Sequence, residues 1–241
     1  MNIRTEVNRM ALIEIDQLNK IYNTTAVPVH AVRDVTLRVE KKEFLAIVGP
    51  SGSGKTTLLN IIGGLDTPTS GKVIIDETDL STLSSSDLVE YRLQHIGFVF
   101  QAYNLIPVFT ARENVEFIML LQGVEKKERE ERAIDLLKQV GLSKRINTRP
   151  AQLSGGEQQR VAVARSLASR PAFVLADEPT ANLDTESAES LLDLMEDLNR
   201  KHEMTFIFST HDERVMRRAR RIITLQDGGV VSDKIVEQKK L

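Results

Sequence analysis

The chain of 241 residues contains no cysteine and no tryptophan. Without thiols it can form neither a disulfide framework nor a thiolate metal site, and the absence fits a reducing compartment. No apolar run approaches the roughly 20 residues that a membrane-spanning helix needs, and residues 1–10 lack the apolar segment of a secretory signal. We therefore expect a soluble protein that reaches a membrane only through a partner.

An excess of either charge is also missing, because 32 Lys and Arg face 34 Asp and Glu, for a formal net charge of −2. A general nucleic-acid-binding protein would show a basic face, so no nucleic-acid partner is expected, although a balanced total leaves room for a local basic patch. The length suits one large α/β domain or a core with a smaller lobe.

One stretch organises the chain. Residues 49–57, with the sequence GPSGSGKTT, lie between an apolar run at 44–48 and a helical pattern at 58–62. A buried strand, a glycine-rich turn and a helix form the context in which GxxxxGK[ST] indicates a phosphate-binding loop. Glycines let successive N–H groups face one hollow, and the positive end of the helix dipole points into it. The stretch therefore predicts binding of nucleotide phosphates.

Two side chains of this loop add a charge and a metal ligand. Lys55 can bring a full positive charge to the outer phosphates, and the Thr56 hydroxyl can ligate Mg²⁺. The expected contacts of the loop with the nucleotide are Gly49, Ser51, Gly52, Ser53, Gly54, Lys55, Thr56 and Thr57.

Acidic residues end a later buried strand. Asp177 and Glu178 follow the apolar run 172–176. Paired acids at the tip of a buried strand are costly unless they serve a cation or a proton transfer. Asp177 suits Mg²⁺ binding, and Glu178 suits orienting or deprotonating an attacking water.

Three further side chains have two interpretations each. Gln101 follows the strand 96–100, at an edge where open α/β sheets bind ligands, or it only ends the strand. His211 lies just beyond the strand 204–208 and either is structural or reaches the terminal phosphate. Tyr22 either packs in the core or stacks on adenine.

A second helix start suited to an anion lies about a hundred residues beyond the first. Ser154 is placed to cap a helix over about 157–168, and Gly155 and Gly156 expose its first N–H groups. The alternative is a capped helix that happens to begin with glycines. One nucleotide needs two such termini only if both face the same phosphates.

The rest of the pattern predicts the framework. Residues 20–28 are expected to connect two strands, and 112–141 read as two amphipathic helices of a small lobe that Pro150 ends. The strands expected outside the motifs are 12–15, 35–39, 72–76, 221–225 and 230–231, the last two as edge strands.

With these residues the chain closely resembles the nucleotide-binding subunit of ATP-binding cassette (ABC) transporters over roughly residues 11–232. Residues 153–158, LSGGEQ, are similar to the signature sequence of that family and are the most specific element. The resemblance implies ATP and Mg²⁺ as cofactors and ATP hydrolysis as the activity. It implies that Tyr22 stacks on adenine, that Asp177 and Thr56 bind Mg²⁺, and that Gln101 contacts Mg²⁺ and the attacking water. It also implies that Glu178 is the general base, that His211 has a switch role and that Lys55 is a further catalytic residue. Residues 181–184, which include Asp184, would form a loop at the dimer seam.

The fold that this resemblance implies is α/β, with a P-loop NTPase core and a mostly parallel sheet. An N-terminal antiparallel β subdomain and a small inserted α-helical subdomain at about residues 102–168 complete it. A single ATPase domain would span residues 11–232, between a flexible leader at 1–10 and a charged tail at 233–241.

Residues 63–71 and 98–107 are similar to subunits of the lipoprotein-release and macrolide-efflux (LolD/MacB) group. This implies a head-to-tail homodimer around two Mg-ATP, in which Ser154, Gly155 and Gly156 of one chain cover the terminal phosphate held by the other. The dimer would drive an integral membrane permease of the LolCE, MacB or FtsX type, exporting lipoprotein or small hydrophobic compounds. The expected location is cytoplasmic, peripheral on the inner face of the cell membrane.

A short helix of the permease is expected to bind in a groove beside Gln101. The groove would be lined by Tyr103, Leu105, Pro107 and Phe109, unless these side chains only pack in the core.

Three other classes of function are compared with this interpretation. A cell-division-type ABC ATPase that signals through a membrane partner without transport stays open. A DNA or ribosome clamp is disfavoured because the chain has no sustained heptads between its motifs and holds one cassette. A non-hydrolysing binding module is disfavoured by Glu178 and His211.

Overall fold

The computed structural model describes residues 11–23 and 27–236, and the expected leader at 1–10 lies outside this part. The apolar run Phe44–Val48 forms strand β3, in which every residue is buried. It lies inside a six-stranded sheet of order β10-β9-β3-β8-β7-β6. The other strands are β6 (Ile96–Val99), β7 (Phe173–Asp177), β8 (Thr205–Thr210), β9 (Arg221–Gln226) and β10 (Gly229–Ile235).

Neighbouring strands of this sheet run parallel, except that β10 runs antiparallel to β9. Strands of a parallel sheet are buried on both faces and read as continuous apolar runs, which is why β3, β7 and β8 were readable in the sequence. Their carboxyl ends meet at one edge, where ligands bind in open α/β sheets.

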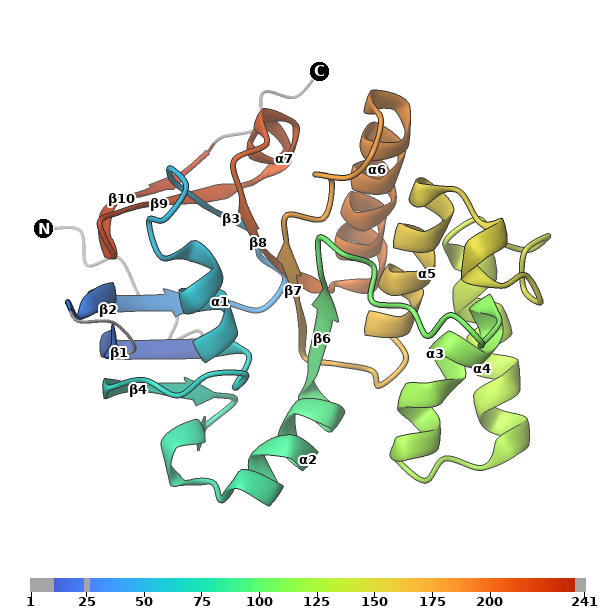
Figure 1. Cartoon of the computed structure of the whole chain (residues 1–241), viewed down its shortest axis with the longest axis horizontal. Helices are drawn as coiled ribbons and strands as arrows, with labels where there is room; N and C mark the ends of the chain where they lie inside the picture. The colour runs from blue at the N-terminus through green and yellow to red at the C-terminus, as the bar shows by residue number, and fades with distance from the viewer. Residues whose placement is uncertain (1–10, 24–26, 237–241) are drawn as a thin grey trace, which may run out of the picture.

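A second sheet is antiparallel, with the order β2-β1-β4-β5. Its strands are β1 (Ile13–Tyr22), β2 (Val29–Val39), β4 (Ser70–Ile75) and β5 (Thr78–Asp79). Its inner face packs on α1 (Lys55–Ile62) and on the large sheet in one apolar cluster that includes Ile15, Val73 and Leu58. The expected antiparallel subdomain and the mostly parallel core are therefore confirmed (Figure 1).

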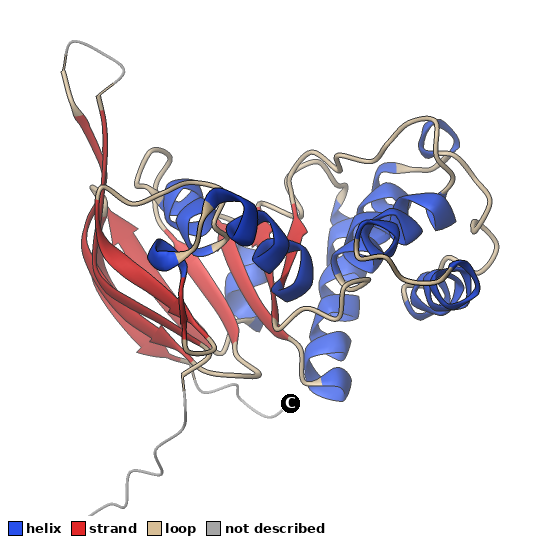
Figure 2. Ribbon diagram, turned by 90° about the horizontal axis from the view of Figure 1, so that it is seen from below, coloured by secondary structure: helices blue, strands red, loops and turns tan. Residues whose placement is uncertain are grey.

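The other helices are α2 (Ser85–His95), α3 (Ala111–Leu121), α4 (Lys126–Gln139), α5 (Gly155–Ser166), α6 (Thr185–His202) and α7 (Glu213–Arg218). Residues 102–168, all of which are described, hold α3, α4 and α5 and no strand. Figures 1 and 2 show α3 and α4 on the side of the molecule away from the antiparallel sheet. Ser84 caps α2, and Thr110 forms a capping box with Glu113 at the start of α3.

Three expectations about strands were wrong. Residues 20–22 belong to β1, not to a connection, because β1 pairs with β2 as far as Tyr22 and Val29. Strand β9 is not an edge strand, since it lies between β10 and β3. The tail expected at 233–241 begins too early, because β10 extends to Ile235.

The added length of β10 has a physical cause. Ile235 pairs with Arg221 of β9, and the Arg221 guanidinium donates to both Asp233 carboxylate oxygens, at 2.8 and 2.7 Å. A bidentate pair of this kind holds the strand end in register.

Among the described helices, none is both long and apolar enough to cross a membrane.

Candidate nucleotide-binding site

The phosphate loop connects β3 to α1 in a conformation that needs glycine. Gly54, the N-cap of α1, has φ +99°, and a Cβ added to it would lie 2.1 Å from the Ala31 carbonyl oxygen. A Cβ on Gly49 would lie 2.2 Å from the carbonyl oxygen of Leu225. Both distances are below any tolerable contact, so the close approach of these backbones fixes glycine at the two positions.

Lys55 and Thr56, the loop residues expected to bind phosphate and Mg²⁺, both make hydrogen bonds within the chain. The Lys55 ammonium is largely buried and donates to the carbonyl oxygens of Gly49 and Pro50, at 2.8 and 3.0 Å. The Thr56 hydroxyl donates to Asp177 Oδ1 at 3.2 Å, across 121 residues of sequence. Burial raises the pKa of Asp177, while hydrogen bonds, including the one from Thr56, act in the opposite direction.

The hydroxyl of Thr56 and the carboxylate of Asp177 fit Mg²⁺, which prefers hard oxygen ligands and shares them with substrate phosphates. A cation there would relieve the cost of a buried carboxylate. These two residues would hold the ion against a phosphate bound by the loop.

A cavity of about 730 Å³ opens beside the loop, within the size range of small-molecule sites. Of the residues predicted from sequence, the cavity brings together Tyr22, Ser51, Gly52, Gly54, Lys55, Thr56, Thr57, Gln101, Glu178 and His211. Val29, His30, Ala31 and Ala181 complete its lining. Segments from both sheets therefore converge on one hollow.

Glu178 lies just past the end of β7 with its backbone at φ +46°. Its N–H donates to the carbonyl of Ser209, at 2.9 Å. One carboxylate oxygen accepts from the Thr210 hydroxyl at 3.0 Å, and the other lies 2.7 Å from His211 Nδ1. The Glu178 side chain is only 16% exposed, whereas His211 is 75% exposed. The pair therefore offers a sheltered carboxylate and an accessible imidazole at the mouth of the cavity.

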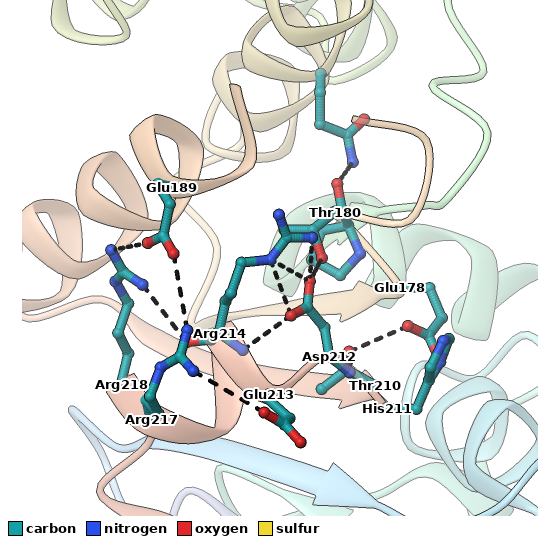
Figure 3. A network of polar contacts seen from close by, with 12 residues as sticks. Glu178, Thr180, Glu189, Thr210, His211, Asp212, Glu213, Arg214, Arg217 and Arg218 are labelled. Atoms are coloured by element: carbon teal, nitrogen blue, oxygen red, sulfur yellow. Dashed lines mark hydrogen bonds and ion pairs between the residues drawn. The ribbon is translucent and has the colours of Figure 1, made fainter. Parts of the chain in front are cut away.

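A network that the sequence did not reveal lies behind this pair (Figure 3). Thr180, which is buried, donates to Asp212 Oδ2 at 2.6 Å, and Arg214 contacts both oxygens of the same carboxylate. Burial by itself would raise the pKa of Asp212, but the hydrogen bonds from Arg214 and Thr180 hold it at about 2. The Asp212 N–H donates to the Thr210 hydroxyl that serves Glu178.

Gln159 is a second residue that sequence reasoning missed. Its side chain is fully buried, and its amide donates to the carbonyls of Phe100 and Pro179, at 3.1 and 2.8 Å. It thereby ties α5 to the residues next to Gln101 and Glu178. The available signal was one polar residue on a helix whose next turn, 161–164, is wholly buried, since buried amides are retained where they find partners.

The start of α5 forms as predicted but does not line this cavity. Ser154 caps the helix and forms a capping box with Glu157, which also pairs with Arg145 at 2.9 Å. Gly155 and Gly156 are the first two helical residues. Within one chain, the two helix starts that are expected to bind anions therefore do not line the same cavity.

Residues 181–184, expected to form a loop at the dimer seam, are the last part of the connection between β7 and α6. The side chain of Asp184 caps α6 by accepting from the Ser187 N–H at 2.9 Å. Asn182 donates to the carbonyl of Gln101, at 3.0 Å. This loop and the Gln101 loop are thus hydrogen-bonded to each other at the edge of the cavity.

Comparisons with known proteins agree with this geometry. The family model described as "ABC transporter" matches residues 32–181. An uncharacterized ABC transporter ATP-binding protein of Thermotoga maritima is 48% identical over 91% of this chain and 93% of its own length. The lipoprotein-releasing system ATP-binding protein LolD of Legionella pneumophila (strain Paris) is 44% identical over 91% of this chain and 96% of its own length.

Solved structures are similar over almost the whole chain. A dimeric bacterial ABC transporter cassette is 42% identical, with a TM-score of 0.86, and the match covers 95% of this chain and all of the other. A dimeric ATP-binding cassette in a post-hydrolysis state with ADP and Pi is 41% identical, with a TM-score of 0.85 over the same shares. With its phosphate loop and paired strand-end acids, the chain belongs to the ABC transporter family, as an ATP-hydrolysing cassette with the P-loop NTPase fold.

Proposed function

We propose that this ATPase is the motor subunit of a LolD-like membrane system and works as a head-to-tail homodimer around two Mg-ATP. The observation that carries the proposal is the separation of the two helix starts. The start of α1 faces the cavity, and the start of α5 does not. A second copy that brings its Ser154, Gly155 and Gly156 over the cavity completes the site, and the solved relatives named above are dimeric.

Each residue of the site then has a task. Lys55 and the N–H groups of the loop bind the phosphates, and Thr56, Gln101 and Asp177 hold Mg²⁺, which supplies charge neutralisation on the phosphate oxygens. Glu178 accepts the proton of the attacking water. His211, in contact with Glu178 at 2.7 Å and mostly exposed, orients this carboxylate and reaches the terminal phosphate. Because ATP binds the closed dimer more tightly than the open one, its hydrolysis releases the halves.

Mixed dimers test the composite site. A chain with Lys55→Met and a chain with Ser154→Arg are each expected to be inactive, since every site of the corresponding homodimer is defective. A mixture forms heterodimers in which one site combines the intact loop of one chain with the intact α5 start of the other. Recovery of ATP hydrolysis on mixing is the expected result. No recovery, although the two chains associate, would refute hydrolysis at a shared site.

The permease contact is proposed at an apolar groove beside the Gln101 loop. It lies between α2, α3 and the end of α5, and its apolar lining consists of Leu65, Val89, Leu93, Ile96, Phe98, Phe100, Ile118 and Leu121. Leu65, Val89 and Leu121 are 44%, 53% and 55% exposed. Exposed apolar residues that gather in one groove mark an interaction site, and an amphipathic helix of a partner binds in such a groove through its apolar face.

The four side chains that were expected either to line such a groove or to pack in the core lie outside this groove. Tyr103, Leu105, Pro107 and Phe109 do not line it. Leu105 packs against the main core, and the ring of Phe109 packs on Phe117 with centroids 5.8 Å apart. The backbone of their loop is held by Arg165 of α5, which donates to the carbonyl of Tyr103 at 3.0 Å.

A matched pair of variants tests the groove. Leu121→Asp puts a charge into it, whereas Leu120→Asp changes the neighbouring residue, which is 49% exposed and does not line the groove. Both should retain the ATPase activity of the isolated protein. Only Leu121→Asp should lose co-purification with the native membrane partner. Equal capture by both variants would place the contact elsewhere.

The localisation that follows is cytoplasmic, peripheral on the inner face of the cell membrane. The cargo class proposed is lipoprotein, as the name of the Legionella relative suggests, or a small hydrophobic compound. The alternative is a cell-division-type subunit that moves a membrane partner without transport. Reconstitution of the captured complex in vesicles separates the two, because only a transporter moves a lipid-anchored or hydrophobic substrate in proportion to the ATP consumed.

A further inference from the structure

Tyr22, whose ring lines the cavity, contacts Asp66 and Lys20, which do not line it. Its phenol oxygen lies 2.6 Å from Asp66 Oδ2, and the Lys20 ammonium lies 2.6 Å from Asp66 Oδ1. Lys20 also lies over the ring, with Nζ 4.8 Å from the centroid. A cation at this distance over a tyrosine face is attracted by the ring quadrupole. One face of the ring is therefore taken by Lys20.

Asp66 is itself fixed from several sides. Its carboxylate accepts from Lys20, from Tyr22 and from the Thr67 N–H at 2.7 Å. Asp66 lies in the turn that follows α1, and its own N–H donates to the carbonyl of Asn60 in that helix, at 3.2 Å. Lys20 donates in addition to the carbonyl of Thr67, at 2.7 Å.

The titration of the pair agrees with this geometry. Burial raises the pKa of Tyr22, and the hydrogen bond with Asp66 raises it further. For Asp66, burial raises the pKa, but the hydrogen bonds from Lys20 and Tyr22 more than offset this and lower it. The phenol is therefore the donor and the carboxylate the acceptor. A hydrogen bond with a charged partner is stronger than a neutral one.

The connection reaches the phosphate site through α1. This helix begins at Lys55 in the phosphate loop, and the turn after it carries Asp66. The ring and the loop are thus anchored on opposite ends of the same short helix. That arrangement fixes the distance between a surface for a base and the groups that bind its phosphates.

We propose that Asp66 and Lys20 are positioning residues for nucleotide binding, which hold the Tyr22 ring with one face open to the base and at a set distance from the phosphate loop. Neither residue contacts the nucleotide. The inference rests on the proposed role of Tyr22 as the base-stacking residue. Its consequence is that loss of Asp66 weakens recognition of the nucleoside part and leaves phosphate recognition intact.

The test compares two probes on the full chain, Mg-ADP and inorganic tripolyphosphate, by calorimetry. Asp66→Ala, which removes the acceptor, should raise the Kd of Mg-ADP about fivefold, the worth of one hydrogen bond, and should leave the Kd of tripolyphosphate unchanged. At saturating ATP its kcat should stay within about twofold of the wild type, since the lost interaction is uniform binding. Glu14→Gln, which removes an exposed carboxylate of the same strand paired with Arg38, should change neither Kd.

A double-mutant cycle shows whether Asp66 acts through Tyr22. Tyr22→Phe keeps the ring and removes the hydrogen bond, so it should match Asp66→Ala, and the double variant should be no weaker than either one. Additive losses, or an equal loss for tripolyphosphate, would overturn the proposal. Tyr22→Ala tests base stacking by Tyr22 separately from positioning by Asp66. It should weaken the affinity for Mg-ADP about tenfold. If it has no effect, base stacking itself is refuted; if only Tyr22→Ala has an effect, the role of Asp66 alone is refuted.

Discussion

Asp212 gives the protein a stabilising interaction that acid should remove. Its side chain is 14% exposed and accepts hydrogen bonds from Thr180 and from the backbone and guanidinium of Arg214. These bonds lower its pKa from the ordinary 3.8 to about 2. At about 1.4 kcal/mol per pKa unit, the ionised carboxylate contributes about 2 kcal/mol to the free energy of unfolding at neutral pH.

The sign follows from the lowered pKa. A carboxyl group that binds its proton less readily in the folded state stabilises that state in full above the unfolded pKa, near 4, and loses the contribution as pH falls through about 2. Asp212→Asn should therefore lower the free energy of unfolding by about 2 kcal/mol at pH 7. At pH 3 the difference between variant and wild type should shrink to about half.

Urea unfolding, followed by circular dichroism at both pH values, measures this difference. Asp193→Asn is the control, because Asp193 is 68% exposed and its pair with Arg218 lies at the surface. Such a pair contributes at most about 1 kcal/mol. The reasoning fails if Asp212→Asn costs no more than the control at pH 7, or if its cost is the same at pH 3.

Three further outcomes are expected. Glu178→Gln should reduce ATP turnover by about 10²- to 10⁴-fold and retain ATP binding. Size-exclusion chromatography with Mg-ATP should then show a stable dimer. An unchanged rate of hydrolysis would contradict the role of Glu178 as the general base. Phe44→Ala, at a fully buried ring 4.7 Å from that of Phe208, should cost about 3–5 kcal/mol in denaturant unfolding. Arg221→Met should leave the Glu43 carboxylate, 3.0 Å from the guanidinium and already raised in pKa by burial, without its cation. Because a raised pKa in the folded state favours the protonated form, this variant should gain stability relative to the wild type as pH falls from 8 to 5; a constant difference would exclude Glu43 as the cause.

The parts of the site that the sequence predicted are local in the chain. Phosphates are bound by consecutive N–H groups, so residues 49–57 carry the whole signal within one turn. The acids after β7 were readable because a buried parallel strand is a continuous apolar run, and a polar residue that ends it stands out. The limits of β1 and β10 were not readable in this way. Both strands lie beside irregular pairings or an ion pair, and pattern alone does not register those.

The residues that sequence reasoning missed all join segments far apart in the chain. Asp66 meets Tyr22 across 44 residues, Thr180 meets Asp212 across 32, and Gln159 meets Phe100 across 59. Each is a common polar residue, and the sequence around it does not indicate which distant residue it contacts. Their partners are set by the tertiary fold, so only coordinates reveal them.

Four residues that form these long-range bonds do not line the cavity themselves: Asp66, Thr180, Asp212 and Gln159. Asp66 holds the ring at one end of α1, and Gln159 connects α5 to the backbone beside Gln101 and Glu178. A start of α5 that closes over the ATP of a second copy is therefore tied, through Gln159, to the residues that act on the ATP of its own chain. In the proposed dimer, Gln159 thus gives the two sites a direct hydrogen-bonded connection.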